Sequence, residues 1–249
     1  MAITSNFLSV WNFMKPLIYP VLAALSLLAA PLQAQQDQPV VVELFTSQGC
    51  SSCPAADAML AEIAGRDDII ALALHVDYWD YIGWKDPFGD ALHAERQRGY
   101  AAVGRRRSIF TPELIVQGQT DIVGAKPMKL MDAVEKHAEV APSIALNIEH
   151  SGDAVQIKAE PLAQPSGLMQ VHMLRYSPME RTKVTRGENA GHVMEHSNVV
   201  QGWQVLAKWD GSTPLSLTAK AEGDLPVVVI IQQQEPGGPG AILAAARSR

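Results

Sequence analysis

The two cysteines of this chain, Cys50 and Cys53, constrain its fold and chemistry more than any other feature. They follow a short apolar run, Val40 to Phe45, and a helical pattern of apolar residues begins directly after them at Pro54. The pair therefore stands in a turn between a buried strand and the start of a helix. Free N–H groups and the helix dipole stabilise a thiolate at such a place. This context predicts a dithiol/disulfide couple, in which Cys50 attacks and Cys53 is the resolving thiol.

Two structural roles compete with redox chemistry for this pair. A disulfide that closes so short a loop constrains the unfolded chain little. Stabilisation of the fold is therefore a weak explanation for a disulfide at this place. A structural zinc site usually needs four ligands, and the chain has only two cysteines. We therefore favour thiol–disulfide exchange over both.

The patterning of apolar residues changes near residue 141. Before this point buried apolar runs alternate with helical patterns, which indicates an α/β domain over residues 35–140. After it apolar and polar residues alternate in many short stretches, which predicts an all-β sandwich-like domain over residues 141–249. The elements expected in the first domain are strands at 40–45, 69–76, 114–117 and 120–123 and helices at 54–64, 89–103 and 128–138.

The N-terminal segment has the form of an export signal. Lys15 precedes a mostly apolar stretch over residues 17–30, and small residues lead to a cleavage point after Ala34. We predict a signal peptide over residues 1–34, with Met14 as an alternative start. The other interpretation is an uncleaved anchor, but the stretch is shorter than the about 20 apolar residues that span a bilayer. We expect the mature protein to be periplasmic or secreted, without a stable membrane span.

Several segments carry a resemblance to a known family. They are ELFTSQGCSSCP, HVDYWDYIGWKDPF and FTPELIVQG, and further on GEN, HSNVV and KWDG. Through them the mature chain resembles the secreted bacterial family named domain of unknown function 1223, and residues 40–138 resemble a thioredoxin-fold domain. The family implies no settled activity. Together with the patterning, the resemblance leads us to expect an α/β thioredoxin-like domain followed by an all-β sandwich-like domain.

The thioredoxin resemblance implies roles for three further residues. Pro112 takes the place of the cis-proline that faces the active-site cysteines, and Thr111 would present its backbone to a bound substrate. Glu43, the charged residue in the first apolar run, resembles the buried acid that exchanges a proton with the resolving cysteine, here Cys53. The alternatives are an ordinary trans-proline that opens a strand, and a Glu43 held by hydrogen bonds from the backbone or from an arginine.

An aromatic loop over residues 77–88 follows the second expected strand. It should lie at the carboxyl end of that strand, where open α/β sheets bind ligands. Its rings, Trp79, Tyr81 and Trp84, form either a lid beside the cysteines or a surface packed against the second domain. The basic run at residues 105–107 favours the Cys50 thiolate, steers an acidic partner, or is a solvated loop.

Together these features predict an exported thiol–disulfide oxidoreductase that acts on protein or small-molecule disulfides. Its partner would be a protein or a small thiol. Its redox group would be the Cys50–Cys53 disulfide, with no other cofactor. The formal charge of −6 argues against a nucleic-acid partner, because such proteins usually carry a basic patch.

A copper-binding or copper-delivery protein is the rival hypothesis from another class. His192, Met194 and His196 alternate, so on a strand they would share one face. Imidazole, thioether and thiolate ligands suit copper, and Cys50 and Cys53 would complete the set. Two unrelated surface histidines are the simpler interpretation. A redox-inert binding module is a third hypothesis.

Overall fold

The structure is a computed structural model that describes residues 38–164 and 167–248. The predicted signal peptide over residues 1–34, including the alternative start at Met14, lies outside the described residues. Within these two ranges no helix is long and apolar enough to cross a membrane.

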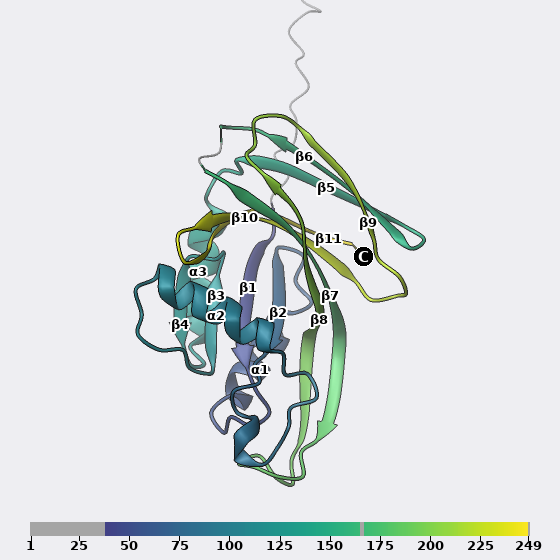
Figure 1. The fold of residues 1–249 in the computed structure, drawn as a ribbon. Helices are drawn as coiled ribbons and strands as arrows, with labels where there is room; N and C mark the ends of the chain where they lie inside the picture. The colour runs from purple at the N-terminus through teal and green to yellow at the C-terminus, as the bar shows by residue number, and fades with distance from the viewer. Residues whose placement is uncertain (1–37, 165–166, 249) are drawn as a thin grey trace, which may run out of the picture. The chain divides into compact units, whose positions relative to one another are not determined.

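Strand β1 (Val40–Thr46) is the central element of the first half, and all seven of its residues are buried. It pairs in parallel with β2 (Ile69–His75) and antiparallel with β3 (Glu113–Val116). β3 in turn pairs with β4 (Thr120–Val123). Figure 1 shows β1 and β2 side by side. Both faces of β1 are covered, which explains its nearly continuous apolar run.

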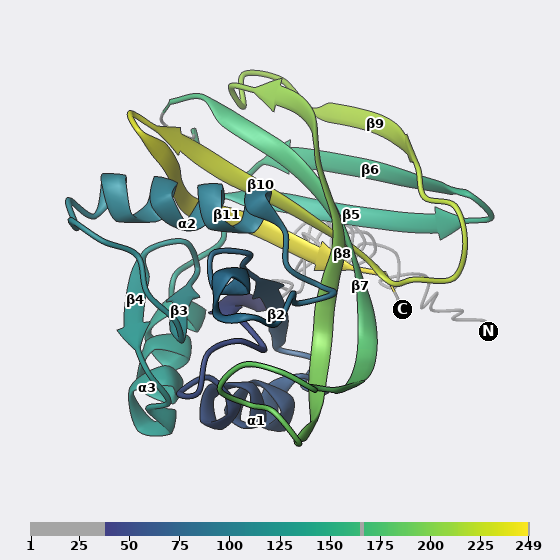
Figure 2. The ribbon, with the colours of Figure 1, turned by 60° about the horizontal axis from the view of Figure 1, so that its bottom comes forward.

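Helices cover the two faces of these strands. α1 (Pro54–Ile63) and α3 (Pro127–Ala138) pack on the face formed by the even-numbered residues of β1. α2 (Ala91–Val103) packs on the opposite face, with the odd-numbered residues. Figure 2 shows α2 on one side of the sheet and α1 and α3 on the other. A short 3-10 helix, η1 (Asp80–Ile82), lies in the aromatic loop.

The second half of the chain adds strands to the same sheet. β7 (Met169–Lys183) and β8 (Val193–Trp209) form a long antiparallel hairpin. β8 joins the first half by pairing in parallel with β2, where Ala73 is opposite Val199. Since β2 would otherwise be an open edge, this hairpin covers an edge that could pair with another chain.

The remaining strands extend the sheet and form a second one. β10 (Val227–Glu235) and β11 (Gly238–Arg247) continue beyond β7, which gives an eight-stranded mixed sheet of order β11-β10-β7-β8-β2-β1-β3-β4. β5 (Ile144–Ser151), β6 (Ala154–Pro161) and β9 (Leu215–Lys220) form a separate sheet of order β5-β6-β9. Apolar residues of this small sheet pack against β7, β10 and β11.

The expected fold class, an α/β thioredoxin-like domain followed by an all-β sandwich-like domain, is wrong. The described chain is mostly β with three α-helices, and one curled eight-stranded mixed sheet contains strands from both halves. The elements expected up to residue 138 are present, in the expected order. The error has a physical cause. Alternation identifies a strand but does not say which sheet it joins, and here β8 pairs with β2.

Candidate functional site

A disulfide joins Cys50 and Cys53, which confirms the cysteine pair expected from the spacing. Cys53 is the N-cap residue of α1, and Pro54 takes the first helical position, where its missing N–H costs no hydrogen bond. The N–H of Cys53 donates to the carbonyl of Cys50 at 3.2 Å. The two residues are thus held in a tight turn at the positive end of the α1 dipole, and we call residues 48–53 the cysteine turn.

Both cysteines are buried, with 1% of Cys50 and none of Cys53 exposed. Neither belongs to the three hydrophobic clusters found among the described residues. Polar groups surround the pair instead. Ser51 and Ser52 are exposed between the cysteines, and the Ser52 hydroxyl lies 3.6 Å from the Cys50 sulfur. The disulfide is therefore shielded from solvent by a polar turn and its neighbours.

The tip of the β7–β8 hairpin, residues 187–189, supplies part of this shield, and we call it the cover segment. Its buried Asn189 donates from the side-chain amide to the carbonyl oxygens of Gln48 at 2.9 Å and Cys50 at 3.0 Å. Figure 1 shows this tip at the same end of the sheet as the start of α1. The segment is the GEN motif, to which sequence reasoning could assign no role. The structure shows that it lies on the cysteine turn.

The aromatic loop packs against the same turn. The indole N–H of Trp84 donates to the side-chain carbonyl of Gln48 at 3.0 Å. A Cβ on Gly49 would lie 2.9 Å from the Cβ of Trp79, so the turn needs glycine at this close approach. Trp79 stacks on Tyr81 with ring centroids 6.3 Å apart, and Tyr81 is 80% exposed. The loop therefore borders the cysteine turn and presents an exposed ring there.

The Thr111–Pro112 peptide bond is cis, as the thioredoxin resemblance leads us to expect. Pro112 directly precedes β3, whose first residues pair with the end of β1. The hydroxyl of Thr111 accepts the indole N–H of Trp79 at 2.7 Å. Because Trp79 also packs against Gly49, it connects the Thr–Pro turn to the cysteine turn.

Glu43 lies on the opposite face of β1 from the cysteines. Odd-numbered residues of β1 face α2, whereas Cys53 begins α1 on the other face. Arg96 of α2 donates to both carboxylate oxygens of Glu43, at 2.6 and 3.1 Å, and the Tyr100 hydroxyl donates to one of them at 2.5 Å. Burial disfavours a charged guanidinium, but the charge of Glu43 outweighs it and raises the pKa of Arg96. The structure thus holds Glu43 with an arginine and does not bring it to Cys53.

A buried polar cluster on the α1 face escaped the sequence analysis. It consists of Asp57, His75, Asp86 and His196, which come from α1, β2, the aromatic loop and β8. His75 Nδ1 lies 2.8 Å from the Asp86 carboxylate, and the His75 ring packs edge-on against His196 with centroids 4.5 Å apart. The sequence held a weak signal, because Asp57 follows Cys53 by one helical turn. Nothing in the sequence places β8 beside these residues.

Asp86 ties this cluster to the cysteine turn. Its carboxylate accepts the backbone N–H of Gln48 at 2.8 Å as well as facing His75. Burial opposes ionisation of the carboxyl group, but the hydrogen bond and charge of His75 and the backbone N–H groups of Gln48 and Phe88 outweigh it. They hold the pKa of Asp86 below its usual value. The Asp86 side chain is thus a charged anchor beneath the residues that precede Cys50.

The residues of the copper hypothesis are not brought together. His192 is exposed just before β8, whereas Met194 and His196 are buried. Within the described ranges no group of three His, Cys, Asp or Glu side chains is placed to hold a metal ion. The structure therefore gives this hypothesis no support.

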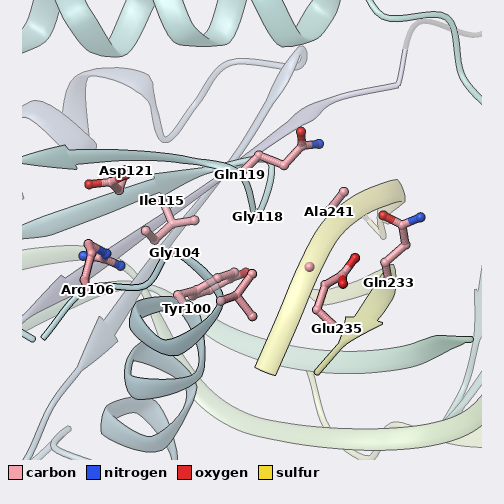
Figure 3. A pocket seen from close by; sticks show the side chains of 12 residues that line it. Tyr100, Gly104, Arg106, Ile115, Gly118, Gln119, Asp121, Gln233, Glu235 and Ala241 are labelled. Carbon is pink, nitrogen blue, oxygen red and sulfur yellow. The ribbon is translucent and has the colours of Figure 1, made fainter. Parts of the chain in front are cut away.

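A hollow of about 320 Å³ lies elsewhere, among α2, the β3–β4 turn and the β10–β11 hairpin. Figure 3 shows Tyr100, Arg106 and Glu235 around it. Neither cysteine lines this hollow. Arg106, from the basic run at residues 105–107, forms an ion pair with Glu113. This arginine is therefore bound to β3.

Comparisons with known proteins place the chain in a family. The chain is similar to the crystal structure of protein AGR_C_4864 from Agrobacterium tumefaciens, with 29% identity and a TM-score of 0.74 over 86% of this chain and 95% of that one. It also shares a fold with HBP35 of Porphyromonas gingivalis, at 16% identity and a TM-score of 0.56 over 85% of this chain and 75% of that one. No curated protein gives a significant match. The family model described as "Protein of unknown function (DUF1223)" matches residues 41–232, so the chain belongs to that family.

Proposed function

We propose that the protein is an exported thiol–disulfide oxidoreductase whose reactive group is the Cys50–Cys53 pair. The observation that carries this proposal is the disulfide itself, which closes at the N-terminus of α1. Free N–H groups and the dipole at a helix N-terminus favour the thiolate that attacks a disulfide. A disulfide across so short a loop stabilises the fold little, because it removes little entropy from the unfolded chain. Thiol–disulfide exchange therefore explains this disulfide better than a stabilising role does.

The groups around the turn suit an external thiol or disulfide. Thr111 and the exposed ring of Tyr81 border the cysteine turn through Trp79. An external thiolate attacks the Cys50 sulfur, the S–S bond breaks, and its electron pair goes to Cys53. A second thiolate then releases the external group from Cys50 as a disulfide. The substrate is a protein or small-molecule disulfide, and the partner is a protein or a small thiol.

The N-terminal sequence supports an extracytoplasmic location for the protein. Residues 17–30 have the apolar core of a signal peptide, with Lys15 before it and Ala34 at the cleavage point. Disulfides form and persist in oxidising compartments such as the periplasm. The protein therefore acts in the periplasm or after secretion.

Trapping of a mixed disulfide tests this proposal and the roles of the two cysteines. Each single-serine variant is incubated with oxidised glutathione, and the bound glutathione is followed by mass spectrometry. We expect Cys53→Ser to keep glutathione on Cys50, because the resolving thiol is missing. The matched variant Cys50→Ser should react at least about tenfold more slowly, because Cys53 is the N-cap residue of α1, whereas Cys50 lies in the turn that precedes the helix. Equal reaction of the two variants, or reaction of neither, would contradict the proposal.

Loosening the cover segment should speed exchange. Asn189→Ala removes two hydrogen bonds to backbone carbonyls of the cysteine turn. These contribute about 1–2 kcal/mol together. If attack requires the segment to move away, the rate of reduction by an external thiol should rise roughly 5- to 30-fold. Asn147→Ala is the matched control, because Asn147 is exposed on β5. An unchanged rate in Asn189→Ala would show that thiols reach Cys50 without this opening.

A further inference from the structure

The polar cluster behind Cys53 contains buried atoms without hydrogen-bond partners. Five of the six buried side-chain N and O atoms that lack a partner, counted over residues 38–164 and 167–248, lie around the cysteine turn. They are Gln48 Nε2, Asp57 Oδ2, His75 Nε2 and both ring nitrogens of His196. Buried polar atoms are nearly always hydrogen-bonded, and a redox or catalytic role is one of the explanations for such exceptions.

Asp57 and His196 form the part of this cluster nearest to α1. Asp57 Oδ1 accepts the hydroxyl of Thr46 at 2.8 Å, and its Oδ2 faces His196 Nδ1 at 3.7 Å. None of the His196 side chain is exposed, and 6% of the Asp57 side chain is. At this separation the two atoms are not hydrogen-bonded, and an approach of about 1 Å would let them share a proton.

Helix geometry places this pair beneath Cys53. The N–H of Asp57 donates to the carbonyl of Cys53 at 3.0 Å, so the two residues are one helical turn apart and on the same face of α1. Thr46 ends β1 on its even-numbered face, which α1 covers. The pair therefore lies on the side of the sheet where the sulfur of Cys53 must gain a proton.

A buried Cys53 needs a local source for that proton. None of Cys53 is exposed, and leaving a thiolate unprotonated in such a place is costly. Glu43, the acid expected from the sequence, is held by Arg96 on the other face. On the correct face the fold offers the buried cluster of Asp57, His75, Asp86 and His196. His75 and Asp86 are hydrogen-bonded to each other, whereas Asp57 Oδ2 and the ring nitrogens of His196 lack a hydrogen-bond partner.

We propose that Asp57 and His196 hold the proton that Cys53 gains when the disulfide is reduced and loses when it re-forms. The inference rests on the proposed thiol–disulfide exchange. An external thiolate bonds to Cys50, the S–S electron pair passes to Cys53, and the thiolate of Cys53 takes the proton from the Asp57–His196 pair. The pair regains a proton from water. Asp57 and His196 act on the external thiol or disulfide only through Cys53, so we call them positioning residues and not catalytic residues.

Other titratable groups lie on the elements around this pair. His75 of β2 packs on the His196 ring and is hydrogen-bonded to Asp86 of the aromatic loop. Glu180 of β7 is the strand partner of His196. Glu188 of the cover segment accepts a bond from the N–H of Ser51, and His93 of α2 contacts the His75 carbonyl.

Reduction kinetics of the full protein test the proposal. The rate with excess dithiothreitol, divided by the concentration of its thiolate, is measured between pH 5 and 8 for wild type, Asp57→Asn and His196→Gln. We expect each substitution to slow reduction roughly a hundredfold, the lower end of what a positioned acid–base group contributes. We also expect wild type to show a pH dependence in this range that both substitutions remove.

His172→Gln is the matched control, since His172 is another buried strand histidine. Burial, helped by the charge of Arg96, lowers the pKa of His172 to about 3, so it is neutral across this range. Its substitution should leave both the rate and the pH profile as in wild type.

A second readout uses the unmodified protein and therefore does not depend on how the variants fold. The ring proton signals of His196 are titrated by NMR in the oxidised and the reduced protein. Because proton binding at coupled sites is reciprocal, we expect the His196 titration to shift on reduction. An identical titration in both states would overturn the inference.

The experiments distinguish a failure of the proposed thiol–disulfide exchange from a failure of the proton-holding role alone. If dithiothreitol does not reduce folded wild type, the proposed function fails and this inference fails with it. If wild type is reduced, but Asp57→Asn and His196→Gln keep its rate and pH profile, only the proton-holding role is wrong.

Discussion

Arg96→Met should lower the free energy of unfolding by about 3–5 kcal/mol, because it leaves the Glu43 carboxylate buried without its counter-charge. The Glu43 side chain is fully buried and that of Arg96 is 9% exposed. Arg96 also donates to Gln232 at 2.9 Å and lies over the Trp203 ring at 4.1 Å. Methionine keeps most of the apolar length of arginine, so the loss reports mainly the charge. Equilibrium unfolding in urea measures it.

Arg181→Met is the control for this prediction. Arg181 and Glu195 form an ion pair at 3.3 Å with side chains 69% and 60% exposed. Exposed pairs contribute little, so this substitution should change stability far less than Arg96→Met does. A loss below about 1 kcal/mol for Arg96→Met would contradict the role that we assign to the Glu43–Arg96 pair. Since this pair lies on the α2 face, folded Arg96→Met should keep the thiol-exchange rate of wild type.

Gly118→Ala should lower the free energy of unfolding by about 3 kcal/mol or more. Gly118 has φ +69°, a conformation that costs an alanine about 1–2 kcal/mol. A Cβ there would also collide with the carbonyl oxygen of Gly240 and lie 3.2 Å from the backbone N of Ile242. Because these are backbone atoms, they cannot move away without distorting the sheet. The overpacking therefore adds about 1–3 kcal/mol to the loss in the free energy of unfolding. The collision would separate the β3–β4 turn from β11, where Ile242 N–H donates to Gln117 at 3.0 Å.

Gly152→Ala separates the two contributions. Gly152 has φ +59°, but a Cβ there would meet nothing within 4 Å. Its substitution should therefore cost only the conformational part, about 1–2 kcal/mol. Equal losses at the two positions, measured by urea unfolding, would show that the β3–β4 turn does not pack closely on β11.

The local elements were predictable from the sequence, whereas the way they assemble was not. The buried run that became β1 and the Pro54 helix start are local signals, and both appear where expected. The length of β8 was not visible, because its residues after Val200 are mostly exposed and show no regular alternation. Its pairing with β2 depends on contacts about 125 residues apart along the chain, such as Ala73 with Val199. No periodicity encodes such a contact.

In the candidate site, too, the local features were predictable from the sequence and the long-range contacts were not. The cysteine pair and the cis Thr111–Pro112 bond were anticipated, the first from spacing and the second from family resemblance. Glu43 was assigned to the cysteines through the thioredoxin resemblance. The period of two along β1 turns it toward α2 instead. The cover segment and His196 come from the β7–β8 hairpin and its second strand, so they could not be assigned before that hairpin was placed.

A redox titration of the folded wild type tests the central claim most directly. The protein is equilibrated in buffers of graded dithiothreitol and oxidised dithiothreitol, its free thiols are alkylated, and circular dichroism follows the fold. We expect one reversible two-electron transition between the disulfide and the dithiol of Cys50 and Cys53, with the fold kept on both sides. A disulfide that stays closed until the protein unfolds would contradict the account.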